Sequence, residues 1–264
     1  MIQTDDSGTP VTPALSAALD AALSCSRTYR ARRVDADQAT GDFHHLAADL
    51  VDPSTGAARE VIARQCEQRG LPYGRHGASL IFQRYSHRIC GLGISAAVLT
   101  SGMPALNVTS TVMIIEKPNP SEILLLSDEM ITDPSPGQIV QALVTNHLEP
   151  LAEAWTSVCR MSRRGLIGNI AASFGSAVRR LEPFIGTEAA LAWGHRLAGT
   201  HPALGSLGNY LVLEHDGRNG LFYERRTCCQ WYVVRDKYCS WCCHHDHEER
   251  LKLFRGQLTG TRDD

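Results

Sequence analysis

The sequence lacks an excess of charge of either sign. Lys and Arg together number 26 against 28 Asp and Glu, which gives a formal net charge of −2 at pH 7. Proteins that bind nucleic acid through its phosphates usually carry a clear basic excess, often on a helix-turn-helix or a similar module. Neither feature is visible here, so we expect no nucleic-acid partner.

A secretory signal and a membrane span are also missing. The first residues, MIQTDDSGTPVTPALSA, carry two acidic side chains and no basic one, unlike the basic start of a secretory signal. The longest uncharged run, from Ile89 to Ile115, includes Pro104, Asn107 and several Ser and Thr residues, too many for a helix in a bilayer. We expect a cytoplasmic protein without a membrane span, and leave open peripheral attachment to the inner face of the membrane.

Cysteine, in contrast, is plentiful, with nine residues. An odd number without an export signal argues against a disulfide framework and favours thiol or metal chemistry. Four cysteines are scattered, and we expect them to be buried core thiols: Cys25, Cys66, Cys90 and Cys159. The other five crowd into one short segment: Cys228, Cys229, Cys239, Cys242 and Cys243. The functional site is therefore expected in this segment.

The hydrophobic pattern predicts an α+β chain, with a mostly helical main domain, β-hairpins and a small cysteine-rich module at the C-terminal end. A capping box is expected where Ser135 caps a helix that begins at Pro136, with Gln138 as its partner. Helices are predicted over 14–33, 57–69, 77–103, 136–158, 164–181, 187–198 and 248–254, and hairpins over 110–126 and 209–225. The chain divides into a flexible N-terminus (1–12), a helical α+β domain (13–205), the C-terminal module (206–255) and a polar tail (256–264).

Two cysteine pairs define the chemistry of the module. Cys239 and Cys242 form a C-x-x-C turn, which can bring two sulfurs to one metal, whereas Cys228 and Cys229 are adjacent. Structural zinc sites normally use two C-x2-4-C turns, and only one is present. The two irons of a [2Fe–2S] cluster offer two tetrahedral corners, so adjacent cysteines need not crowd one ion. The spacing favours a cluster over zinc, with reduced thiols and no metal as a third alternative.

The segment Arg225-Arg-Thr-Cys-Cys229 followed by Cys239-Ser-Trp-Cys242 resembles the C-terminal motif of the FhuF-type ferric-siderophore reductases. That motif is C-C-x10-C-x2-C and ligates one [2Fe–2S] cluster. Residues 146–152 and 168–173 also resemble stretches that precede the cluster in this family, so the likeness covers roughly residues 75–245. It implies an iron–sulfur module over 206–255, with Cys228, Cys229, Cys239 and Cys242 as ligands, and a larger domain similar to a subdomain of siderophore synthetases.

The sequence departs from this motif in the loop. Nine residues separate Cys229 from Cys239 instead of ten, and Cys243 follows Cys242 directly. Keeping the family offset would select Cys243 as the last ligand, whereas keeping the C-x-x-C turn selects Cys242. We favour the turn because a loop absorbs a one-residue deletion more easily than a chelate absorbs a changed geometry. Cys243 stays as the alternative fourth ligand.

The resemblance implies an iron–sulfur oxidoreductase that reduces a Fe(III)-siderophore, of hydroxamate type, by one electron and releases Fe(II) in the cytoplasm. No catalytic residue beyond the cluster is expected. Gly91-Leu-Gly93 lacks the third glycine of a dinucleotide fingerprint, so electrons are expected from a separate donor such as a ferredoxin or a reductase. The alternative is a non-enzymatic siderophore- or protein-binding module with a structural zinc knuckle.

Basic residues surround the cysteines in the sequence. From residue 218 to residue 239, five basic residues face two acidic ones. The four nearest the cysteines form what we call the basic collar: Arg225, Arg226, Arg235 and Lys237. The collar can stabilise a reduced cluster or dock an anionic chelate or an acidic donor, and a solvated hairpin face explains it equally well. The histidines after the cysteines are expected to begin a solvated helix rather than to bind metal: His244, His245 and His247.

Overall fold

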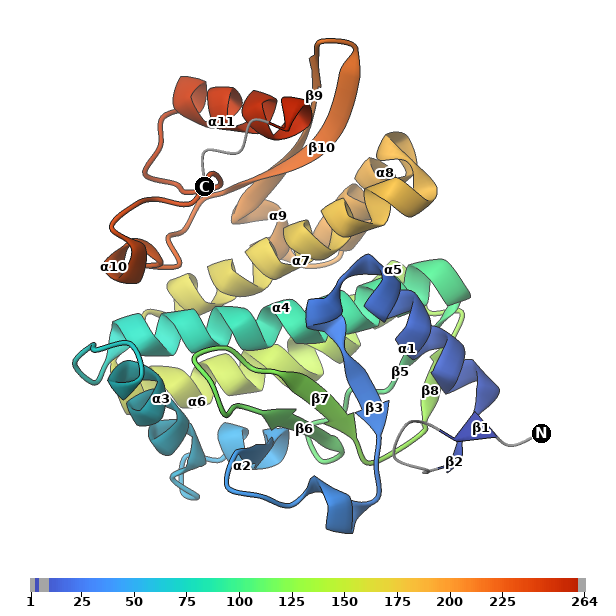
Figure 1. The fold of residues 1–264 in the computed structure, drawn as a ribbon, viewed down its shortest axis with the longest axis vertical. Coiled ribbons are helices and arrows are strands. Elements are labelled where there is room, and N and C mark those ends of the chain that lie inside the picture. The colour runs from blue at the N-terminus through green and yellow to red at the C-terminus, as the bar shows by residue number, and fades with distance from the viewer. Residues whose placement is uncertain (1–2, 5–9, 261–264) are drawn as a thin grey trace.

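A computed structural model describes residues 3–4 and 10–260 of the chain. The protein is α+β and mostly helical, as predicted (Figure 1). Its α-helices are α1 (Pro13–Cys25), α2 (Ala47–Val51), α3 (Ala57–Glu67), α4 (Arg75–Thr100), α5 (Pro136–Val140), α6 (Glu149–Cys159), α7 (Arg163–Ile185), α8 (Thr187–Gly199), α9 (Pro202–Ser206), α10 (Tyr232–Arg235) and α11 (His247–Thr259).

The strands are short, apart from one hairpin, and pair into small sheets. They are β1 (Gln3–Thr4), β2 (Pro10–Val11), β3 (Ala31–Arg33), β4 (His44–Leu46), β5 (Gly102–Pro104), β6 (Thr111–Ile114), β7 (Glu122–Leu125), β8 (Met130–Thr132), β9 (Gly208–His215) and β10 (Arg218–Arg225). The flexible N-terminus predicted over 1–12 lies largely outside the described residues, and so does the end of the predicted polar tail.

Helices α4 and α7 form the centre of the protein. Most of α4 and α7 is buried, and the two helices make the most extensive helix–helix contact in the described chain. Both begin at the end of the molecule where α10 lies (Figure 1). On one side they pack against α1, α3 and α6, and on the other α7 carries α8 and the β9–β10 hairpin. The N-terminal ends of α4 and α7 therefore lie close to the segment that carries the cysteines.

The predicted hairpin over 110–126 is confirmed, because β6 and β7 pair antiparallel. It forms the middle of a four-stranded sheet with the order β3-β7-β6-β4, in which β3 runs parallel to β7. The helix predicted over 14–33 is wrong beyond Cys25. The Ser26 hydroxyl accepts the Thr28 N–H at 3.2 Å and starts a 3-10 turn, after which the chain enters β3. Arg32 and Arg33 lie in this strand, where Arg32 pairs with Glu122 at 3.0 Å.

The predicted capping box at Ser135 is confirmed. The Ser135 hydroxyl accepts the Gln138 N–H at 3.3 Å, and the Gln138 side chain accepts the Ser135 N–H at 2.9 Å. The helix then continues without interruption to Cys159, and its middle, residues 141–148, is π-helical. The sequence pattern did not predict this wider turn, which carries the buried His147.

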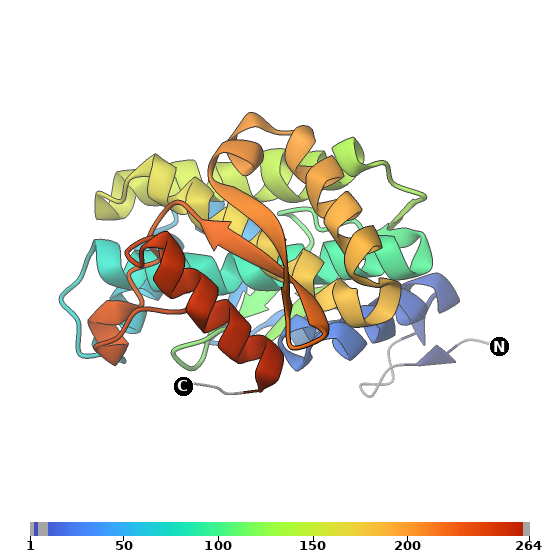
Figure 2. The same cartoon turned by 90° about the horizontal axis from the view of Figure 1, so that it is seen from above.

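The β9–β10 hairpin connects the cysteine segment to the core. It turns over two residues with positive φ, Asp216 (52°) and Gly217 (68°), which suits the twist of a two-residue hairpin. Figure 2 shows the hairpin crossing over α7, with α11 beside it. Phe222 of β10 stacks on Phe254 of α11 with ring centroids 4.6 Å apart. Tyr223 belongs to the same continuous hydrophobic core as the main helices.

Helix α11 is longer than predicted, because it starts at His247 and includes residues 256–259 of the predicted polar tail. The boundary near residue 205 between a main domain and a module stays a prediction. Within the described residues, no helix is both long and apolar enough to cross a bilayer.

Candidate metal centre

The cysteine segment follows β10 as an irregular loop around the short helix α10. The adjacent pair, Cys228 and Cys229, comes directly after the hairpin, and the C-x-x-C pair follows α10. The Cys242 N–H donates to the Cys239 carbonyl at 2.8 Å, so this pair forms a tight turn as expected for a chelating element. Gln230 and Asp236 have positive φ (65° and 52°) and turn the chain on either side of α10.

The four predicted ligands lie together and contact each other through their sulfur atoms. Hydrogen bonds between thiols join Cys229 to Cys239, Cys239 to Cys242, and Cys242 to Cys228. The adjacent cysteines thus face different partners: Cys229 faces Cys239, and Cys228 faces Cys242. Cys243 is half-buried beside them and bonds to Cys242. The structure places all five clustered cysteines in one site.

The site is partly shielded from water, and its thiols differ in acidity. Cys229 and Cys242 are each 3% exposed. The hydrogen bond from Cys239, together with Arg225 and a backbone N–H, lowers the pKa of Cys229 to about 6 despite burial. The same bond to Cys229 raises the pKa of Cys239 to about 11, and the pKa of Cys228 is raised by its bond to Cys242 and by burial. A metal ion that binds here must displace protons from the remaining thiols.

Backbone N–H groups point at three of the sulfurs. The Gln230 N–H donates to the Cys228 Sγ at 3.2 Å. The Trp231 N–H donates to Cys229, and the His244 N–H donates to Cys242. Hydrogen bonds to a ligating sulfur stabilise its negative charge and tune the metal that it holds. These N–H groups can stabilise the thiolates that form once a metal displaces the protons.

One histidine lies closer to the site than predicted. A sulfur of Cys228, a sulfur of Cys242 and a ring nitrogen of His244 lie within 4.8 Å of one another, so this group can hold a metal ion. The His244 side chain is exposed and stacks on Tyr238 with ring centroids 5.0 Å apart. The helix that was expected to start near His244 begins three residues later, capped by Asp246. His244 therefore belongs to the candidate donor set.

Arg225 is the most unusual charged group near the thiols. It is 2% exposed, its Nη2 donates to the Asn169 Oδ1 at 2.8 Å, and its Nε donates to the Thr227 carbonyl. In the described part of the chain it makes no ion pair with a carboxylate. Its charge lowers the pKa of both Cys229 and Cys239. Since buried charges are costly unless they are paired, deprotonated cysteines are the natural counter-charge for this guanidinium.

Two residues far away in the sequence hold the cysteine loop in place. The Ser79 hydroxyl of α4 donates to the Cys229 carbonyl at 3.0 Å, and the Asn169 Nδ2 of α7 donates to the Ser79 Oγ at 3.1 Å. At Gly168 a Cβ would lie 1.9 Å from the Thr227 Oγ1, so only glycine lets the loop approach α7 this closely. Sequence analysis singled out residues 168–173 as a family-like stretch, but it did not identify Ser79 or Asn169 as site residues.

The other members of the basic collar do not join Arg225. Arg226 is exposed, and its Nη1 donates to the Ser206 carbonyl at 3.0 Å. Arg235 is exposed and lies over the Trp231 ring at 5.5 Å from its centroid. Lys237 is exposed as well. The collar therefore splits into one buried cation that serves the thiols and three surface cations.

A cavity of about 260 Å³ opens beside the cysteines. Cys229 and Cys239 form part of its wall, and helices α4 and α7 form the opposite side. Its other lining residues are Gln83, Arg84, His87, Ala172, Ser173, Ser176, Arg180, Arg225, Trp231, Ser240 and Trp241. Trp231 and Trp241 thus border an open space.

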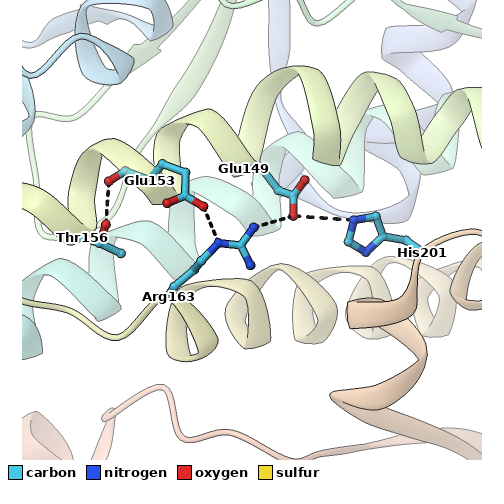
Figure 3. Close-up of polar contacts among 5 residues, drawn as sticks. All are labelled: Glu149, Glu153, Thr156, Arg163 and His201. Carbon is cyan, nitrogen blue, oxygen red and sulfur yellow. Dashed lines mark hydrogen bonds and ion pairs between the residues drawn. The ribbon is translucent and has the colours of Figure 1, made fainter.

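A second polar group lies on α6, α7 and α9 (Figure 3). Arg163 lies between two carboxylates: it donates to Glu149 at 3.3 Å and also to Glu153. His201 approaches the same Glu149 oxygen at 3.6 Å. The carboxylates neutralise the Arg163 guanidinium, and the group contains no thiol, so it fastens helices together.

Other residues from the sequence analysis lie in the core. His147 is 1% exposed, and its ring bonds to the Tyr85 hydroxyl at 2.7 Å and to the Leu106 carbonyl at 2.6 Å. It is a core histidine. Among the scattered cysteines, Cys66, Cys90 and Cys159 are buried, and Cys25 is half-buried.

The donor set fits a metal held by thiolates. The four sulfurs form a chain of neighbouring pairs, and backbone donors face three of them. The buried Arg225 beside them has no carboxylate partner in the described chain. Soft sulfur donors of this kind select zinc or iron–sulfur clusters over magnesium or calcium. In comparisons with known proteins, the chain matches no family model and no curated protein sequence.

Proposed function

We propose that Cys228, Cys229, Cys239 and Cys242 hold a [2Fe–2S] cluster and that the protein is a cytoplasmic ferric-siderophore reductase. The observation that carries the proposal is the buried Arg225, which lies beside Cys229 and Cys239 and has no carboxylate partner in the described chain. A cluster with four thiolates is formally a dianion before reduction. One guanidinium beside it lowers the cost of placing that charge in a partly buried site.

The pairing of the sulfurs supports two irons rather than one metal ion. Two adjacent cysteines cannot easily bind the same metal ion. Here Cys228 and Cys229 face different partners, Cys242 and Cys239. This arrangement allows the two adjacent cysteines to serve different irons. The resemblance of the cysteine motif to the FhuF-type reductases supports the same ligand set, with Cys243 as the alternative to Cys242.

The reaction is the transfer of one electron to a ferric chelate. When bound, a [2Fe–2S] centre supplies single electrons at low potential, near about −400 mV for plant-type clusters. The substrate Fe(III), held by the oxygen atoms of the siderophore, takes one electron and becomes Fe(II), which these oxygens hold much more weakly. The chain itself holds the thiolates, compensates their charge through Arg225 and leaves Cys229 and Cys239 next to a cavity that can receive the chelate. The electron comes from a separate donor protein.

Metal analysis tests the cofactor. We expect protein purified without air to be reddish-brown, with about two irons and about two acid-labile sulfides per chain. The matched control is Cys66→Ser, a buried thiol outside the site, which should keep the full cluster. Colourless protein that holds stoichiometric zinc would overturn the cluster assignment.

Turnover tests the reaction. Protein reduced with dithionite should be reoxidised by a ferric hydroxamate siderophore, with Fe(II) appearing in the presence of a ferrous trap. The trap matters because removal of the product pulls an unfavourable transfer forward. If the reduced cluster is inert towards several ferric siderophores even with the trap, the reductase assignment fails although the cluster assignment stands.

A zinc-binding module is the second candidate. It is favoured by the group of Cys228, Cys242 and His244, whose ligand atoms lie within 4.8 Å of one another. Zinc accepts such mixed sulfur and nitrogen donors in tetrahedral sites. His244→Ala separates the candidates, because it should weaken a zinc site and leave a cluster held by four cysteines at full occupancy.

A further inference from the structure

We infer that the cavity beside Cys229 and Cys239 binds the anionic edge of the ferric chelate, so that the protein prefers negatively charged chelates to cationic ones. As an assignment of the substrate, the inference rests on the proposed function. As an assignment of a binding site, it stands on the residues that line the cavity.

Three arginines from three different elements line this cavity: Arg84 of α4, Arg180 of α7 and Arg225 at the end of β10. No Asp or Glu is among the described residues that line it. In the described part of the chain, none of the three arginines forms an ion pair with a carboxylate, in contrast to Arg163 on α7. Arg84 and Arg225 also face the Cys229 thiol, so the positive charge that no anion of the described site balances is chiefly that of Arg180.

The arginines are held in place by uncharged groups. The Arg84 guanidinium lies over the Trp231 ring at 4.8 Å from its centroid, and Arg180 lies over Tyr29 at 5.7 Å. Arg225 is fixed by its bond to Asn169. Aromatic faces and amides orient a guanidinium without cancelling its charge. Such groups are ready to bind carboxylates or other anionic oxygens.

A second basic residue of α4 adds to this field. Arg88 is 6% exposed, lies one turn beyond Arg84, and has a buried Nε without a hydrogen-bond partner. His87 lines the cavity between these arginines, and its ring faces the Thr28 hydroxyl at 3.4 Å. Burial, followed by the charges of Arg180, Arg84 and Arg88, lowers the pKa of His87 to about 3, and no acid offsets them. An anion in the cavity would offset the repulsion between Arg84 and Arg88.

The remaining lining suits an oxygen-rich ligand. Ser173 and Ser176 offer hydroxyl groups. The Trp231 ring already carries Arg84 and Arg235, and Arg179 lies over the Trp241 ring. The volume of about 260 Å³ lies just below the range of roughly 300–1,000 Å³ that is usual for drug-sized ligands. The cavity thus takes a small chelate or the charged edge of a larger one. A ligand held there contacts the wall that contains Cys229 and Cys239.

The arginines can be divided by what they face. Arg84 and Arg225 are close enough to Cys229 for their charges to interact with its thiol, so their positive charge also serves the metal centre. Arg180 does not act on any of the clustered cysteines; its charge acts on His87, Tyr29 and Cys25. Arg180 is therefore the residue whose removal tests ligand binding without disturbing the cluster.

The experiment measures binding of redox-silent Ga(III) chelates to the anaerobically purified protein by calorimetry, with quenching of tryptophan fluorescence as a second readout. Ga(III) citrate is the anionic probe, and the Ga(III) complex of desferrioxamine B is the cationic one. We expect the anionic probe to bind at least about tenfold more tightly than the cationic probe and more weakly at high salt. Arg180→Gln should weaken the anionic probe about tenfold, while cluster content and melting temperature stay unchanged.

Arg196→Gln is the matched control, because Arg196 is also an exposed arginine stacked on an aromatic ring, Trp193, but lies outside the cavity. It should bind both probes like the wild type. An unchanged affinity in Arg180→Gln, or equal affinity for the two probes, overturns the inference. If metal-free citrate binds as tightly as Ga(III) citrate, the cavity binds an anion and not specifically a metal chelate. Failure of the reductase assignment is detected separately, by absence of Fe(II) from ferric chelates that the protein does bind.

Discussion

Two groups of charged residues in this protein use arginine in opposite ways. On α6 and α7, Arg163 lies between Glu149 and Glu153, and Glu149 also faces His201 (Figure 3). Beside the cysteines, Arg225 is buried and bonds to an amide and a carbonyl. In the first group, carboxylates of the chain already neutralise the arginine. The second is incomplete until an anion joins it.

The two arginines differ in how their positive charge is stabilised. Arg163 has a side chain that is 54% exposed, so water solvates it and its ion pairs add little stability. Arg225 is 2% exposed and cannot rely on water. A buried cation without an acid is tolerated only where other anions neutralise it, and the thiols next to it are the groups that can. The charge pattern therefore separates a structural contact from a site that holds a ligand.

The largest effect should come from removing the anions of the second group. Cys228→Ser, Cys229→Ser and Cys239→Ser should each abolish the cluster, since each sulfur bonds to another thiol of the site. Iron and sulfide content and the visible spectrum measure the loss. Cys242→Ser should remove more cluster than Cys243→Ser. If Cys243→Ser alone bleaches the protein, the family offset has been kept and the C-x-x-C turn does not supply the last ligand.

Removing the buried cation should cost less than removing a ligand, and more than removing any surface charge. Arg225→Met leaves the thiolates without their counter-charge, and breaking one side of a buried pair typically costs about 3–5 kcal/mol. We expect reduced cluster occupancy and, in the cluster that remains, a more negative reduction potential, measured by redox titration. Arg163→Met, the control from the other group, should leave both quantities unchanged. A wild-type potential in Arg225→Met would contradict the role of Arg225.

His87 lies between arginines, and its protonation should make the stability of the protein depend on pH. Its pKa is lowered to about 3 by burial and by Arg180, Arg84 and Arg88, against about 6.5 in an unfolded chain. Since the folded pKa is the lower one, the neutral ring contributes stability above pH 6.5 that is lost as pH falls towards 3. Between pH 7 and pH 5.5, wild-type stability should fall about 1 kcal/mol more than that of His87→Gln. Urea unfolding measures this, and equal slopes would show that the ring protonates freely in the folded protein.

The smallest effect is expected from a substitution in the group of Arg163 and its carboxylate partners. Arg163→Gln removes exposed ion pairs to Glu149 and Glu153, which are worth up to about 1 kcal/mol and weaken in salt. Thermal unfolding at low and high salt measures the change, which should be larger at low salt. Metal content should stay at the wild-type value. Loss of the cluster in this variant would mean that the two groups are coupled through α7.

Local sequence patterns predicted much of the fold. The capping box at Ser135 and both hairpins depend on neighbouring residues, and the structure contains them. The helix expected over 14–33 failed because β3 is held by pairing with β7, about ninety residues further along the chain. Strand pairing of this kind overrides a local helical pattern, since each strand bond depends on a partner that the local sequence does not contain.

The candidate site shows the same division. The crowding of five cysteines identified the segment, because thiols at such short spacing can converge wherever the segment lies. The sequence predicts that the histidines after the cysteines begin a solvated helix. The structure instead brings the His244 ring nitrogen close to Cys228 and Cys242. Ser79 and Asn169 could not be recognised as site residues from the sequence, because a single Ser or Asn in a buried helix is common.

The sequence by itself determined the helical α+β class, the capped helix starts, the two hairpins and the location of a thiol site at the C-terminal end. Only the tertiary structure decided which thiols face each other, that Arg225 is buried beside them without an acid, and that Arg84, Arg180 and Arg225 meet in one cavity. The physical reason is that propensity and capping act between residues a few positions apart, whereas the charge of a site is the sum over every element that packs against it.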